Sequence, residues 1–176
     1  MRHYFILSLA LVFCLLALAP RVSAQSVPNL SDQKLQQIRE NCVADQSILQ
    51  RLQASDVATR VSRGQVYASL LSNLIGPFNS RVSLNRYDAS ELTAETAQLQ
   101  KDFNNFKSDY SQYATNFSAM LSVKCESKPA DFYDDLQTTR ELRAKLASDV
   151  SALDQHFNDY SAAFERLAGS ITGVQQ

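Results

Sequence analysis

Large apolar and aromatic residues between positions 89 and 124 recur in alternating steps of four and three. This spacing is the a/d repeat of a heptad pattern, in which one stripe of a helix packs against partner helices. It predicts a helix near 89–124, and Asp88 followed by Glu91 resembles a capping box that would start it near Ala89. The predicted core stripe consists of Leu92, Leu99, Phe103, Phe106, Tyr110, Tyr113, Phe117 and Met120.

The last third of the chain repeats the same spacing and predicts a second helix near 129–169. Ser127 suits its N-cap, and Pro129 suits its first turn. The short connection after position 124 makes these two helices antiparallel neighbours. The core stripe of this helix is predicted to contain Phe132, Leu136, Leu146, Val150, Leu153, Phe157, Tyr160, Phe164, Leu167 and Ile171.

A third helix, near 31–75, has a less regular pattern. Its apolar residues form two stripes that are offset by about one residue, which predicts a stutter or a local kink near 54–56. Gly64 weakens the same region, and Gly76-Pro77 is predicted to end the helix. The first stripe is Leu35, Ile38, Cys42, Leu49 and Leu52, and the second is Val57, Val61, Ala68, Leu71 and Ile75.

Each helix has one apolar stripe and a polar remainder, so the three must bury their stripes against one another. The chain is therefore predicted to be all-α: an elongated antiparallel three-helix bundle with coiled-coil-like heptad packing. Residues 25–176 would form this single domain.

The first residues have the features of a signal peptide. A short basic region with Arg2 precedes an apolar run that Pro20 ends, and small residues lead up to Ala24. We expect residues 1–24 to be removed, which predicts a secreted or periplasmic protein. The alternative is an uncleaved anchor, which would be the chain's one contact with a membrane, although the run is shorter than the ~20 residues needed to span it.

Charge argues against a nucleic-acid partner. Removing 1–24 lowers the count of basic residues from 17 to 15 against 18 acidic ones, which leaves a net charge of −3. Nucleic-acid-binding domains usually carry a concentrated basic face.

Two cysteines, Cys42 and Cys125, remain in the mature chain. They lie at nearly equal distances from the turn between the first two predicted helices, so their sulfur atoms should meet at one end of the bundle. In an exported chain this pair predicts a disulfide. A structural zinc site is not expected, because it would need four ligands and only the two thiols and His156 are available. His156 is also predicted to lie toward the opposite end of the bundle from the thiols.

Catalytic and cofactor motifs are missing from the sequence, which contains no CxxC, HExxH, P-loop, GxGxxG or GxSxG. His156 is the sole histidine after position 24 and is predicted to lie at a flank of the core or in solvent. Asp154 and Asp159 could form carboxylate pairs, but acids on a polar helix face are usually solvated. We therefore expect a protein that is not an enzyme and that has no cofactor or metal.

The connection 74–88 carries the candidate partner-binding residues Phe78, Arg81, Arg86 and Tyr87, because arginine and aromatic residues are enriched in interface hot spots. Nearby Arg60 and Arg63 are expected to make this end basic. The alternative is that the apolar residues plug the core against Leu167 and Ile171.

Two functions fit these features. The first is a non-enzymatic protein that binds a protein partner, of a kind the sequence does not identify, at the cell envelope. The alternative is an extracytoplasmic holdase-like chaperone or a carrier of apolar ligands, which would use a groove between splayed helices.

Overall fold

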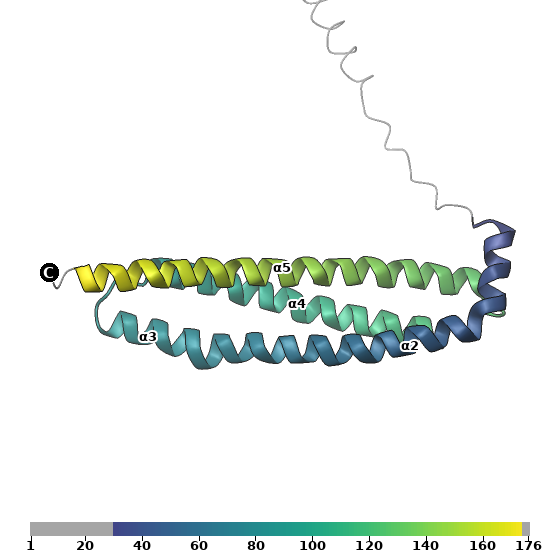
Figure 1. Ribbon diagram of the computed structural model, residues 1–176, viewed down its shortest axis with the longest axis horizontal. Helices are drawn as coiled ribbons and strands as arrows, with labels where there is room; N and C mark the ends of the chain where they lie inside the picture. Colours follow the sequence, from purple (N-terminus) through teal and green to yellow (C-terminus); the bar gives the residue numbers. More distant parts are fainter. Residues whose placement is uncertain (1–29, 174–176) are drawn as a thin grey trace, which may run out of the picture. The chain divides into compact units, whose positions relative to one another are not determined.

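The computed structural model describes residues 30–173, so the predicted signal peptide lies outside the described residues. The helices are α2 (Asp32–Ser69), the π-helical turn η2 (Leu70–Ile75), α3 (Gly76–Leu84), α4 (Ser90–Ser122) and α5 (Pro129–Gly173) (Figure 1). Because α2, η2 and α3 follow one another without a break, they form one helical stretch beside α4 and α5. The predicted all-α three-helix bundle is confirmed. Within residues 30–173 there is no strand, and no helix is long and apolar enough to cross a membrane.

The prediction that Gly76-Pro77 ends the first helix is wrong. The chain passes through η2, where the Gly76 N–H donates to the carbonyl of Leu71, and it continues as α3 to Leu84. Pro77 occupies the first turn of α3, where its missing N–H is tolerated. A Cβ on residue 76 would lie 3.2 Å from the Leu71 oxygen, so glycine permits this close approach.

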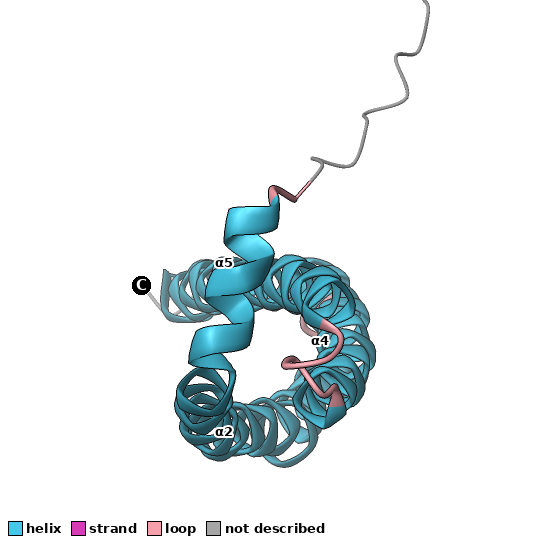
Figure 2. Ribbon diagram, turned by 90° about the vertical axis from the view of Figure 1, so that its right-hand side faces the viewer, coloured by secondary structure: helices cyan, strands magenta, loops and turns pink. Residues whose placement is uncertain are grey.

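The predicted kink near 54–56 is also wrong, because α2 keeps its α-helical conformation from Asp32 to Ser69. The bend occurs earlier: Figure 1 shows the first turns of α2 leaving the direction of the rest, and Figure 2 shows them crossing toward α5. There the Lys34 ammonium lies 5.3 Å from the centre of the Tyr133 ring. These first turns thus cover the start of α5.

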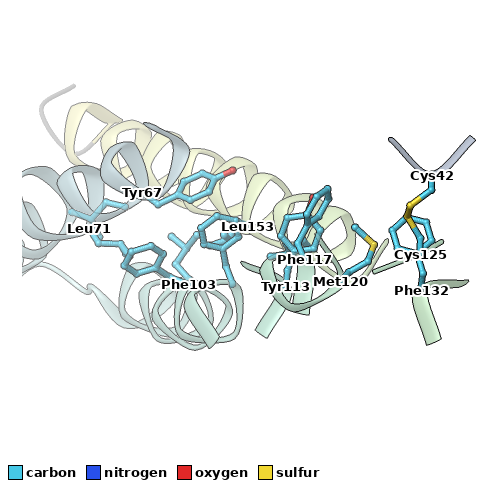
Figure 3. Packing of buried hydrophobic residues seen from close by; sticks show 14 residues of the cluster. Cys42, Tyr67, Leu71, Phe103, Tyr113, Phe117, Met120, Cys125, Phe132 and Leu153 are labelled. Carbon is cyan, nitrogen blue, oxygen red and sulfur yellow. A yellow bond between two sulfur atoms is a disulfide. The ribbon is translucent and has the colours of Figure 1, made fainter. Parts of the chain in front are cut away.

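The core is built mainly between α4 and α5, which share the most extensive interface. Seven of the eight predicted stripe residues of α4 are buried, and Tyr110 packs against them. Figure 3 shows core side chains following one another along the bundle, from Tyr67 and Leu71 to the disulfide. The heptad prediction therefore holds for α4. On α5 it fails near the end, where Ala163 is buried and Phe164 is 43% exposed.

The second predicted stripe of α2 is wrong at two positions. Val57 and Val61 are 40% and 42% exposed, whereas Asp56 is buried. Asp56 takes the inward position because it accepts hydrogen bonds from Tyr113 of α4 and Arg143 of α5. Because the Asp56 carboxylate has hydrogen-bond partners inside the bundle, it can be buried in place of the valines. The helix therefore needs no one-residue offset between its two stripes to turn Val57 inward.

The predicted disulfide between Cys42 and Cys125 is present, with the two Cα atoms 5.6 Å apart. It fastens α2 to the connection between α4 and α5, and both residues are buried. Beside it, the Gln46 amide donates to the carbonyls of Leu121 and Val123, at 3.3 and 2.8 Å. These contacts satisfy carbonyl groups that the end of α4 leaves open.

Candidate functional site

The first candidate site is the end of the bundle opposite the disulfide, where the chain passes from α3 to α4. We call it the tip, and define it as α3, the connection 85–89 and residues 164–171 of α5. Residues 74–88 were predicted to be a connection between helices, but Phe78 and Arg81 both lie on α3. The loop itself is short, and Arg86 adopts a left-handed backbone conformation there (φ 61°). The helix α3 therefore holds two of the four candidate residues, and the connection holds the other two, Arg86 and Tyr87.

An apolar cavity of about 260 Å³ opens at the tip. Phe78 and Phe164 form one wall, with their ring centres 5.2 Å apart. Arg81 and Asn85 are its polar contributors. The lining consists of Phe78, Arg81, Val82, Asn85, Tyr87, Phe164, Leu167, Ala168 and Ile171.

Three of the four predicted partner-binding residues, Phe78, Arg81 and Tyr87, thus meet around one cavity. Arg86 is exposed on the connection and does not line it. The alternative prediction of a plugged core also applies in part, because Val82 is buried in a small cluster on which Phe78 and Leu167 pack. Tyr87 nevertheless remains 47% exposed, and the neighbouring Leu84 is 81% exposed.

The prediction that Arg60 and Arg63 add positive charge at this end is wrong. Both line a surface hollow beside Asp56 and Arg143, well before the tip along α2. The Arg60 guanidinium lies 5.4 Å from the centre of the Tyr113 ring, where the ring face attracts a cation. The tip carries three arginines, Arg81, Arg86 and Arg166, and Arg166 is paired with Glu91 at 2.9 Å.

A polar network around Asp56 joins all three helices, and sequence analysis missed it. The Tyr113 hydroxyl donates to Asp56 Oδ2 at 2.5 Å, and Arg143 donates to both carboxylate oxygens, at 3.1 and 3.2 Å. Burial, and then the nearby carboxylate, raise the pKa of the Tyr113 hydroxyl far above its ordinary value. The phenol therefore stays neutral and acts as a structural hydrogen-bond donor.

A second network lies between α4 and α5. Asp109 is buried and accepts a hydrogen bond from the Lys145 ammonium at 2.8 Å. Asp149 lies beside it, and its Oδ2 atom is buried without a hydrogen-bond partner. Burial, together with a hydrogen bond to Asp109, raises the pKa of Asp149 to about 6. Two acids thus compete for one lysine.

The third network contains His156, which is half-buried between α5 and α4. Its Nδ1 atom lies 2.9 Å from Glu95 Oε2 and 3.9 Å from Asp159 Oδ2, and its Nε2 atom lies 3.5 Å from Asp102 Oδ2. One possible ligand atom from each of Glu95, His156 and Asp159 lies within 4.8 Å of the other two, which is close enough for the three to hold a metal ion. His156 and Asp159 are separated by three positions on one helix face, which is the signal in the sequence. The partners on α4 leave no such signal.

No protein-family model, curated protein sequence or solved structure matches this chain.

Proposed function

We propose that this chain is a non-enzymatic, extracytoplasmic binding protein that holds a protein partner at the cell envelope through its tip. The observation that carries the proposal is the open apolar cavity, which the exposed Tyr87 helps to line, together with the exposed Leu84 at the end of α3. A disulfide favours an oxidising compartment, which supports the extracytoplasmic location.

The tip combines the two kinds of group that dominate binding energy in protein interfaces. The cavity can accept one apolar side chain of a partner, where desolvation makes the contact strong. Arg81 and Arg86 are exposed next to it, so they can pair with carboxylates around that side chain. The expected partner surface is therefore an apolar anchor with acidic neighbours.

Photo-crosslinking in the native host tests this proposal. A photoreactive amino acid is placed at Leu84, and at Val43 as the matched control, because these residues are 81% and 71% exposed but lie toward opposite ends of the helical stretch 32–84. A discrete adduct should form from Leu84 only. Arg81→Glu combined with Arg86→Glu should remove it while leaving the melting temperature nearly unchanged. Equal adducts from both positions, or an adduct that survives the double substitution, would refute docking at the tip.

A second candidate function is the carriage of an apolar ligand, since the cavity lining is almost wholly apolar. An apolar fluorescent dye should then bind the folded protein, and Ala168→Leu should displace it by filling the cavity. Ala144→Leu, on the exposed face of the same helix, is the control. Dye binding that Ala168→Leu leaves unchanged would remove this candidate.

A further inference from the structure

We propose that Glu95, His156 and Asp159 form a binding site for a divalent first-row transition-metal ion, with His156 Nδ1 as the nitrogen ligand. The site lies between α4, which carries Glu95, and α5, which carries the other two ligands. It is separate from the tip and does not depend on the function proposed for it.

The spacing of the three side chains suits a small metal ion. Metal–ligand bonds of about 2.0–2.2 Å place two ligands of a tetrahedral zinc ion about 3.3–3.6 Å apart. The observed distances from His156 Nδ1, 2.9 Å to Glu95 Oε2 and 3.9 Å to Asp159 Oδ2, fall on either side of that value. All three ligand atoms lie within 4.8 Å of one another, so side-chain adjustments of about an ångström would bring them to bonding distance from one ion.

Two neighbouring side chains orient these ligands. Asp102 Oδ2 lies 3.5 Å from His156 Nε2, and its side chain is 15% exposed. When a metal ion replaces the proton that Nδ1 shares with Glu95, the remaining ring proton lies on Nε2 and can be donated to Asp102, which fixes the orientation of the ring. The Gln155 amide donates to both carboxylate oxygens of Asp159, at 3.0 and 3.1 Å, and restricts the rotation of that carboxylate.

Charge around the ring also favours a cation. Three carboxylates, those of Glu95, Asp102 and Asp159, surround a single imidazole. With a neutral ring the group carries three negative charges, two of which a divalent ion would neutralise. The imidazole ligand selects transition metals over Ca²⁺ and Mg²⁺, which prefer oxygen ligands alone. Because the His156 and Glu95 side chains are each 28% exposed, water can complete the coordination.

The test is a titration of the metal-stripped, disulfide-intact exported protein with ZnCl₂ by isothermal calorimetry at neutral pH. One Zn²⁺ should bind per chain, and excess Ca²⁺ should not displace it. His156→Gln should weaken binding more than about 100-fold, and Asp102→Asn, which acts through His156, by about 10–100-fold. Glu141→Gln, an exposed acid on the same helix, is the matched control and should leave the affinity unchanged.

Two further measurements separate loss of the metal site from loss of folding and identify the nitrogen ligand. Zn²⁺ should raise the melting temperature of the wild type, because it bridges α4 and α5, but not that of His156→Gln. Asp159→Asn is the second ligand variant if His156→Gln folds poorly. Imidazole ¹⁵N shifts of the loaded protein should identify Nδ1 as the ligand and Nε2 as protonated. Coordination through Nε2, Zn²⁺ binding that survives His156→Gln, or no saturable binding would overturn the assignment.

Discussion

Replacing Asp149 by asparagine should stabilise this protein, and the gain should appear only above about pH 4. Asp149 has a buried oxygen without a partner and lies beside the buried Asp109. Lys145 pairs with Asp109 rather than with Asp149. Asparagine keeps the shape of the side chain, removes the second negative charge and offers an N–H donor to the remaining carboxylate.

The direction and size of the effect follow from the pKa of Asp149, which is about 6 in the folded chain against an ordinary value of 3.8. Its raised pKa means that the folded state prefers the protonated form. The associated stability is fully present below about pH 4 and is lost as the pH rises through about 6. A pKa difference of about 2 corresponds to about 3 kcal/mol. Partial exposure screens the charge, so we expect a gain of about 1–3 kcal/mol for Asp149→Asn at neutral pH.

Urea unfolding followed by circular dichroism measures this gain across the pH range 4–8, at constant ionic strength and with the disulfide intact. The free energy of unfolding of Asp149→Asn should match that of the wild type near pH 4 and exceed it increasingly up to about pH 7. Glu141→Gln, an exposed acid on the same helix, should follow the wild type at every pH. A difference that does not change with pH, or a loss of stability at neutral pH, would refute the assigned environment of Asp149.

Three other substitutions test the packing. Joint replacement of Cys42 and Cys125 by alanine should lower the free energy of unfolding by about 4–5 kcal/mol, because the disulfide closes a loop with a sequence separation of 83, and helicity at low temperature should survive; an unchanged denaturant midpoint would contradict this. Phe106→Ala should cost about 3–5 kcal/mol in the same assay, since its side chain is 2% exposed, and a loss below ~1 kcal/mol would place the heptad stripe wrongly. Asp56→Ala should lower the free energy of unfolding by about 1–3 kcal/mol, because it leaves the buried Tyr113 hydroxyl without its acceptor. Val57→Ala should change it by no more than ~0.5 kcal/mol, because Val57 is exposed. A larger loss for Val57→Ala than for Asp56→Ala would support the stripe predicted from the sequence.

The helices themselves could be predicted because their signals are local. A heptad stripe tells which face of α4 is buried without reference to any partner, and Leu99, Phe106 and Phe117 are indeed buried. The disulfide was predictable for a related reason. Helical rise converts sequence distance from a turn into axial position, so Cys42 and Cys125 could be matched even though the helix ends were misplaced.

Polar residues inside the bundle escaped sequence analysis because their burial depends on partners from other helices. Asp56 looks like a surface acid next to Val57, and Tyr113 and Arg143 make its inward position favourable. Gly76-Pro77 looks like a helix end, yet a π-helical turn accommodates it. At the tip, the sequence indicated an aromatic and basic cluster, but the cavity required the last turns of α5 to lie against α3.

The sequence by itself thus determined three long helices and the end at which the disulfide fastens them, because periodicity and rise are properties of a single helix. Only the tertiary structure decided which side chains meet between helices. The group of Glu95, Asp102, His156 and Asp159 depends on both the axial register and the rotation of α4 relative to α5. A shift of one residue along α4 turns each side chain by about 100° around the helix, since a turn takes 3.6 residues, and would separate Glu95 from His156.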